Sequence, residues 1–143
     1  MGDSVIRLVG VSAAPLDVTA VHDVVQDRSA GAVVLFVGTV RDHDGGRTVT
    51  ELAYSAHPSA ESVMHEVVAG IVAEQPVEAV AAVHRVGDLA VGDAAVVVAV
   101  ACGHRGEAFD VGQRLIDAIK ATVPIWKHQT FADGTDEWVG TPQ

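Results

Sequence analysis

Runs of apolar residues along the chain alternate with stretches in which apolar positions recur every three or four residues. The apolar runs, which are typical of β-strands, cover residues 4–12, 31–41, 77–87 and 94–103. We expect the run at 31–41 to be buried on both faces and the nearly all-apolar run at 94–103 to be a central strand. A further strand at 48–56 follows the turn-rich segment "DHDGGR" and is predicted to pair back in a hairpin.

Two segments have the apolar spacing of amphipathic helices and carry a residue suited to begin them. Residues 16–27 follow this pattern, and Asp17 is the expected N-cap. A second apolar stripe begins after Ser59, which is also expected to be an N-cap, and continues to about Glu74. Both segments therefore predict helices with one apolar face.

A third helix is predicted over about residues 105–121. It is expected to end ahead of Pro124, because proline cannot continue the helical hydrogen-bond ladder. The residues that we expect this helix to direct inward are Phe109, Leu115, Ile116 and Ile119. Beyond the helix, "IWKHQTF" and "DEWVG" flank the turn "ADGT" and predict a closing hairpin.

The order of these elements predicts the fold class. Strands are grouped in pairs rather than alternating strictly with helices, which favours an α+β fold with mixed or antiparallel sheets and three main helices. A chain of 143 residues, 49% of them hydrophobic, is large enough to bury a core. Since no run of Pro, Gly, Ser or charged residues marks a linker, residues 1–143 are predicted to form a single domain.

Charge and composition exclude several classes of function. A net charge of −10 and a pI near 4.9 argue against binding to nucleic acid, which requires cations to displace counterions from phosphates, and disfavour membrane surfaces likewise. The first residues carry no basic segment followed by a long apolar run. No stretch reaches the roughly 18 apolar residues that cross a bilayer. We therefore expect a cytoplasmic protein.

Cysteine and histidine give no sign of a metal centre. The single cysteine, Cys102, excludes an internal disulfide framework, and none of the seven histidines pairs with it at zinc-ligand spacing. A cysteine hydrolase using Cys102 and His104 is one alternative. However, two residues so close together at a strand end are poorly placed to pair, and a small buried residue is the favoured interpretation of Cys102.

Lysine is used in only one part of the chain. Lys120 and Lys127 are the only two lysines, whereas the other seven formal cations are arginines. Lysine differs from arginine in that its amine can lose a proton and act as a base or nucleophile. Taken singly, Lys120 suits the last turn of a helix and Lys127 an exposed hairpin. Because arginine supplies every other formal cation of the chain, the occurrence of both lysines in one short segment favours a role in catalysis.

Other cations lie where strands end. Arg41 directly follows the apolar run at 31–41, beside a glycine-rich loop. His104 and Arg105 lie where the run at 94–103 passes into the third helix, so that their side chains and the free N–H groups of the first turn are suited to hold an anion.

Four blocks in register resemble the large, catalytic subunit of molybdopterin synthase. They are "FVGTVRDH", "VHRVGDLAVGD", "HRGEAFDVGQRLIDAIK" and "PIWKHQTFADGTDEWV", and the match extends from about residue 31 to 139. The resemblance implies an α/β-hammerhead fold and a sulfur transferase that converts cyclic pyranopterin monophosphate to molybdopterin by forming a dithiolene. The pterin is then a substrate, and no cofactor or metal is expected.

The resemblance also implies partners. The sulfur comes from the C-terminal Gly-Gly thiocarboxylate of a small ubiquitin-like carrier subunit, which enters a pocket of the large subunit. The implied assembly is a heterotetramer, in which a homodimer of the large subunit binds one carrier at each end.

Carried over by motif position, the resemblance implies a set of site residues. The implied substrate-binding residues are Thr39, Val40, Arg41, His104, Arg105, Lys120, Lys127, His128 and Gln129. We expect Lys120 to be the main catalytic amine, and Lys127 to assist it or to bind the thiocarboxylate terminus.

Some features leave alternatives open. His128 and Gln129 stand where the family usually has a basic and then an acidic residue, and glutamine cannot act as a base. A non-catalytic carrier-binding subunit with the same fold is therefore the competing hypothesis. Phe36 is a candidate for the pocket wall, although a buried strand residue is the favoured interpretation. His84 and Arg85 are interpreted as residues that only join sheet and helix.

Overall fold

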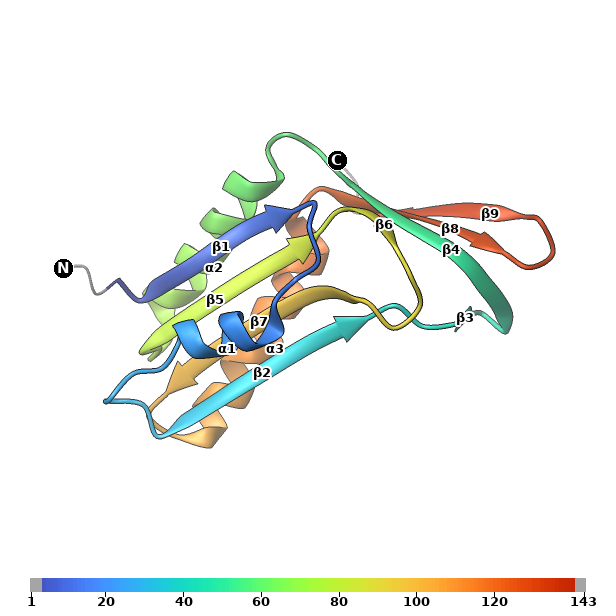
Figure 1. Cartoon of the computed structure of the whole chain (residues 1–143). Coiled ribbons are helices and arrows are strands. Elements are labelled where there is room, and N and C mark those ends of the chain that lie inside the picture. Colours follow the sequence, from blue (N-terminus) through green and yellow to red (C-terminus); the bar gives the residue numbers. More distant parts are fainter. Residues whose placement is uncertain (1–3, 141–143) are drawn as a thin grey trace.

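The structure, a computed structural model, describes residues 4–140 and contains two sheets and three helices (Figure 1). The first sheet has the order β1-β5-β7-β2. Its strands are β1 (Ile6–Ser12), β5 (Ala79–Arg85), β7 (Ala94–Cys102) and β2 (Ala32–Thr39). β1 pairs in parallel with β5, whereas the β5–β7 and β7–β2 pairs are antiparallel. The mixed sheet confirms the predicted α+β class.

The second sheet is antiparallel and extends beyond the end of the first (Figure 1). Its strands are β3 (His43–Asp44), β4 (Arg47–Ala56), β8 (Ile125–Phe131) and β9 (Asp136–Gly140), with β6 (Gly87–Leu89) paired to β4. β8 and β9 form the predicted closing hairpin. The hairpin predicted for β4 is limited to the two-residue β3, to which it is joined by a tight turn with Gly45 and Gly46 at positive φ. β8 is the main partner of β4.

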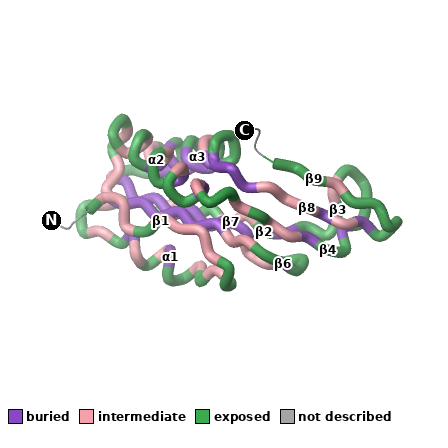
Figure 2. Tube along the Cα trace, turned by 90° about the horizontal axis from the view of Figure 1, so that it is seen from above, coloured by how far each residue is buried: buried purple, intermediate pink, exposed green. Residues whose placement is uncertain are grey.

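Helices cover both faces of the first sheet. α2 (Ala60–Glu74) and α3 (Arg105–Thr122) share one apolar cluster with one face, and α1 (Val18–Val24) shares another with the opposite face. β7 lies inside the sheet between these layers, and its residues 95–102 are all buried, as predicted (Figure 2). Gly112 lets α3 approach β2 closely, since a Cβ there would lie 3.4 Å from Val34.

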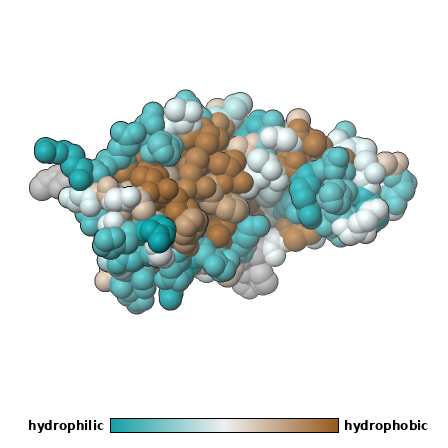
Figure 3. Space-filling model, turned by 90° about the horizontal axis from the view of Figure 1, so that it is seen from below, coloured by the Kyte–Doolittle hydropathy of each residue, from teal (hydrophilic) through white to brown (hydrophobic). Residues whose placement is uncertain are grey.

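The prediction that β2 is buried on both faces is wrong. β2 is an edge strand, and α1 packs over β5 and β7 instead of covering it. Leu35 and Phe36 consequently keep 38% and 37% of their surface exposed. Figure 3 views the molecule from the side on which β2 lies in Figure 1, and it shows apolar side chains gathered on this side. An unpaired apolar edge of this kind is a ready template for pairing with another chain.

The predicted N-caps and the predicted inward face of the third helix are confirmed only in part. Asp17 caps α1 as predicted, accepting a hydrogen bond from the Ala20 N–H at 3.0 Å. Ser59 makes no capping bond, because its hydroxyl is 2.8 Å from Nδ1 of His57. Phe109 is 64% exposed, since it lies one position off the α3 stripe and is rotated about 100° from the buried Ala108.

Among residues 4–140, no helix combines the length and the apolar character that crossing a bilayer demands.

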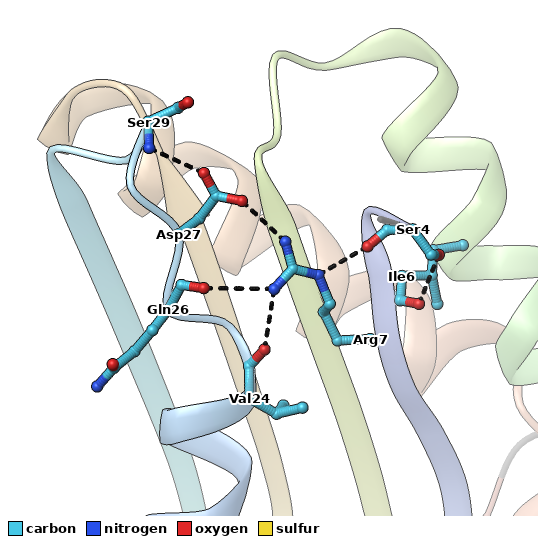
Figure 4. Close-up of polar contacts among 7 residues, drawn as sticks. All are labelled: Ser4, Ile6, Arg7, Val24, Gln26, Asp27 and Ser29. Carbon is cyan, nitrogen blue, oxygen red and sulfur yellow. Dashed lines mark hydrogen bonds and ion pairs between the residues drawn. The ribbon is translucent and has the colours of Figure 1, made fainter. Parts of the chain in front are cut away.

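Arg7 ties β1 to the segment that joins α1 to β2 (Figure 4). Its guanidinium donates to the carbonyl oxygens of Val24 and Gln26 at 3.2 and 3.3 Å and pairs with the Asp27 carboxylate at 2.8 Å. The backbone N–H of Ser29 and the Arg7 guanidinium both donate to this carboxylate and lower the pKa of Asp27. One arginine thus fastens the connection between α1 and β2 to the edge strand β1.

We expect Arg7→Met to lower the free energy of unfolding at pH 7, because it removes the ion pair to Asp27 and the hydrogen bonds to two carbonyl oxygens. The pKa of Asp27 is lowered in the folded state, so the contribution of this ion pair is present above the unfolded pKa and is lost as the pH falls through the folded pKa. Urea denaturation should show that the difference in unfolding free energy between wild type and Arg7→Met is smaller in acid than at pH 7. Arg28→Met is the matched control, because Arg28 is exposed. An equal effect of both substitutions would contradict the assignment.

Candidate active site

A cavity of about 250 Å³ lies where the C-terminal end of α3 meets both sheets. Its lining residues are Tyr54, His84, Val96, Ile116, Ile119, Lys120, Val123, Ile125, Lys127, Val139 and Gly140. Most of the wall is aliphatic, and the polar groups are two amines, a phenol and an imidazole. An apolar cleft with a few converging polar groups is typical of a small-molecule site.

Both lysines reach this cavity because the chain turns sharply after α3. Lys120 lies in the last turn of the helix, and Val123 is the C-cap, followed at once by Pro124. β8 then begins and places Lys127 opposite Tyr54 of β4. The structure therefore brings the only two lysines of the chain into one cavity.

Tyr54 and His84 form the inner polar wall. Their rings meet edge to face with centroids 4.9 Å apart. Burial lowers the pKa of His84, although the hydrogen bond to the Arg85 carbonyl opposes this change, and the positive charge of Lys120 lowers it further. Burial also raises the pKa of Tyr54. Both shifts favour the neutral forms of these side chains, which can donate or accept hydrogen bonds in the cavity.

Gln129 lies on the same face of β8 as Lys127 but is buried below it. Its side-chain amide donates one hydrogen to Asp44 at 2.6 Å and the other to Glu137 at 2.7 Å. The hydrogen bond from Gln129 is the main cause of the lowered pKa of Asp44, and the charges of Lys127, Arg41 and Arg47 lower this pKa further. Gln129 is thus a donor that holds two carboxylates, which an acidic residue at this position would repel.

His128 does not reach the cavity. Alternate residues of a strand point to opposite faces, so His128 lies on the other side of β8 from Lys127. There it stacks on Trp138 with ring centroids 4.3 Å apart, and its Nε2 is 2.7 Å from Asp136. Its predicted substrate-binding role gains no support from this position.

Thr39, Val40 and Arg41 lie at the end of β2 that is nearer to the lysines, because Thr39 pairs with the first residue of β7. Val40 is buried in a small cluster with Leu52. The Arg41 side chain is exposed and is 3.7 Å from Asp44. None of the three lines the cavity.

His104 and Arg105 lie at the opposite end of α3. Fifteen residues separate Arg105 from Lys120, which corresponds to about 22 Å along a helix axis. His104 occupies the N-cap position without a capping bond from its side chain. Within one chain the predicted set therefore splits into two groups, one at each end of the helix.

The predicted alternatives can be compared with the structure. Cys102 is fully buried and burial raises the pKa of its thiol, so a cysteine nucleophile is disfavoured. Among residues 4–140, no group of three or more His, Cys, Asp or Glu side chains is arranged to hold a metal ion. The sequence interpretation of His84 as a residue that joins sheet and helix missed its place in the cavity, and Tyr54 was not predicted at all. Neither position follows from a local sequence pattern, because the two residues meet where one sheet adjoins the other.

The protein is a small α+β domain with an amine-lined cavity between a helix end and two sheets. The family model described as "MoaE protein" matches residues 11–122, and the chain belongs to this family. It is 40% identical over 127 residues to "Molybdopterin synthase catalytic subunit 1" of Mycobacterium tuberculosis, covering 88% of this chain and 86% of that protein. It is 39% identical over 131 residues to the catalytic subunit of a Nostoc species, covering 90% and 79%.

Solved structures agree with this assignment. Molybdopterin synthase from Staphylococcus aureus superposes with a TM-score of 0.86 at 32% identity, covering 92% of this chain and 96% of that one. A complex of subunits 1 and 2 of the molybdopterin-converting factor from Helicobacter pylori shares the fold, with a TM-score of 0.68 and 18% identity. The activity is that of a molybdopterin synthase catalytic subunit, which favours the catalytic over the non-catalytic hypothesis.

Gly140 closes one side of the cavity and is packed against Trp126. A Cβ at this position would overlap Cδ1 of the indole and lie 2.8 Å from its Cγ. We expect Gly140→Ala to displace the end of β9, to lower the free energy of unfolding by about 1 to 3 kcal/mol, and to reduce activity. Thermal and urea denaturation with a parallel activity assay would measure both effects. Gly70→Ala is the control, since an added Cβ on α2 meets nothing within 4 Å. Identical behaviour of the two variants would contradict the packing argument.

Proposed function

We propose that the cavity binds cyclic pyranopterin monophosphate and that the enzyme converts it to molybdopterin by forming the dithiolene. The observation that carries the proposal is the convergence of Lys120 and Lys127 in one largely aliphatic cavity. Aliphatic walls such as Ile116 and Ile119 suit the faces of a flat ring system, and the polar groups suit its edges. Sulfur is taken from the C-terminal thiocarboxylate of a small ubiquitin-like carrier, which makes the reaction a sulfur transfer.

The two amines have different roles in this proposal. Sulfur attack at a pterin carbon requires a group that donates or removes protons as oxygen leaves, and a lysine amine can do both. Lys120, held in the last turn of α3, is the main catalytic group. Lys127 assists it or binds the thiocarboxylate terminus from β8. The proposed reaction uses the pterin as substrate and requires neither a metal nor a bound cofactor.

The carrier is proposed to enter the cavity through its Gly-Gly terminus, because residues without side chains occupy little of a cavity of about 250 Å³. The Helicobacter pylori relative, whose title names a complex of two subunits, supports a partner of this kind. The proposal places the enzyme in the cytoplasm, where it meets both the carrier and the pterin.

A second copy of the chain is proposed to complete the site. β2 offers an unpaired edge with exposed Leu35 and Phe36, which a two-fold partner would cover. α3 returns along β7 and so runs in the same direction as β2. Pairing β2 with its own copy would therefore set the two α3 helices antiparallel. His104 and Arg105 of one copy would then approach Lys120 of the other and supply the cations that the single chain leaves about 22 Å away.

This arrangement accounts for the heterotetramer that the family resemblance implies. The homodimer forms the centre, and each of its two cavities accepts one carrier from outside. Arg105 is suited to hold the cyclic phosphate, because a guanidinium can bind phosphate oxygens with two parallel hydrogen bonds.

The role of Lys120 can be tested in a single-turnover assay with thiocarboxylated carrier and cyclic pyranopterin monophosphate. We expect Lys120→Ala to reduce dithiolene formation at least about 100-fold, which is the lower range for losing a general acid or base. Lys120→Arg keeps the charge but not the proton transfer, so it should be similarly impaired. The control is Arg114→Ala, which removes an exposed cation of α3 paired with Asp110. Full activity of Lys120→Arg would refute the acid–base role.

The shared site can be tested by complementation. Arg105→Ala and Lys120→Ala proteins should each be inactive alone. When they are mixed and allowed to exchange subunits, half of the dimers are hybrids with one intact site each. The mixture should therefore regain about one quarter of the wild-type activity. A mixture that stays as inactive as its components, with exchange verified by native mass spectrometry, would show that the second copy does not complete the site.

A further inference from the structure

His84 is the most buried polar residue of the cavity wall. It lies on β5, inside the first sheet, paired with Val11 on one side and Val96 on the other. It keeps 9% of its surface exposed, and its ring lines the cavity. An imidazole at this depth must satisfy its polar atoms, because an unpaired buried polar group is costly.

The hydrogen-bond partner of Nδ1 fixes the tautomer of this ring. Nδ1 is 2.7 Å from the carbonyl oxygen of Arg85, and a carbonyl can only accept, so Nδ1 carries the hydrogen. Burial and the nearby charge of Lys120 both lower the pKa of His84, which keeps the ring neutral. In a neutral imidazole with a hydrogen on Nδ1, Nε2 is an acceptor. The Tyr54 ring packs edge to face against the imidazole and limits its rotation.

The other side chains of the cavity do not provide a comparable acceptor. Lys120 and Lys127 can only donate when charged, and the remaining wall is aliphatic apart from the Tyr54 hydroxyl. Among the lining residues that the structure describes, none is a carboxylate or an amide. A heteroaromatic substrate with N–H groups on its edge needs an acceptor to pair with them, and a site that reads such an edge discriminates strongly against analogues that lack it.

We propose that His84 is a specificity-determining residue, whose Nε2 accepts a hydrogen bond from a ring N–H of the bound pterin. The inference rests on the proposed function, since it assumes that the cavity is the pterin site. His84 selects the orientation of the ring, whereas Lys120 performs the proton transfer. A substrate analogue that presents an acceptor at this edge is rejected, because two acceptors would face each other.

Two substitutions of His84 test the roles of Nδ1 and Nε2 separately. His84→Gln places an amide oxygen near the position of Nε2 and retains the acceptor, whereas His84→Asn places its amide nitrogen near Nδ1 and retains only the bond to Arg85. We expect the Asn variant to bind the pterin roughly 10- to 100-fold more weakly, as for a buried group left unpaired. The Gln variant should stay within a few-fold of wild type. Binding is measured by pterin fluorescence, and KM and kcat by the carrier-dependent assay, with Gly70→Ala as the control.

The outcomes are distinct. An active Asn variant with an impaired Gln variant would show that only the bond to Arg85 matters, and equal binding with a lower kcat in both would show that His84 acts through Lys120. Either result overturns the inference while the proposed function stands. Absence of binding and turnover in the wild type would overturn the proposed function and the inference together.

A measurement on the unmodified enzyme covers the case in which the variants do not fold. In a ¹⁵N-histidine-labelled protein, the assigned Nε2 resonance of His84 should move upfield when the pterin binds, because the nitrogen then accepts a hydrogen bond. The resonance of Nδ1 should change little, since its bond to Arg85 is already formed. An unchanged Nε2 resonance at saturating pterin would overturn the inference.

Discussion

The structure depends on the burial of β7 from both sides. This strand consists almost entirely of Ala and Val, and such small, flat side chains allow helices to pack closely on each face. α2 and α3 occupy one face and α1 the other, so β7 is the layer on which both apolar clusters are built. Because α3 begins within two residues of the end of β7, it returns along the strand and ends near Val96, where the cavity lies. The position of the site is thus a consequence of how one apolar strand is covered.

The chemistry of the site follows from an acidic chain that concentrates a few cations. Lys127 and Arg41 lie near Asp44, and Gln129 holds Asp44 and Glu137 side by side through the two hydrogens of its amide. The neutral amide of Gln129 can donate to both carboxylates, whereas a carboxylate at this position would repel them. The departure from the usual residue at this position is therefore compatible with an ordered site, and the cavity above it keeps its two amines.

Several features of this molecule could be predicted from sequence, and the failures share one cause. The lysine pair followed from counting residues, and the three helices, the central strand and the closing hairpin followed from periodicity. Burial of β2 was predicted wrongly because an apolar run does not reveal whether its strand lies in the middle or at the edge of a sheet. Phe109 was misplaced by one position, which in a helix is enough to turn a side chain from core to solvent. Tyr54 and His84 meet only because β4 and β5 belong to sheets whose junction no local pattern encodes.

The short path between the two amines has an implication for how the site arises. Lys120 and Lys127 are seven residues apart and are joined by the end of one helix, a proline turn and the start of a strand. They are therefore brought into one cavity over a short sequence separation, which costs little chain entropy once α3 docks. Tyr54 on β4 and His84 on β5, by contrast, are distant from that pair in sequence and reach the cavity only through long-range contacts of the fold. Both amines are encoded in one continuous segment, whereas Tyr54 and His84 come from strands that lie far away in the sequence.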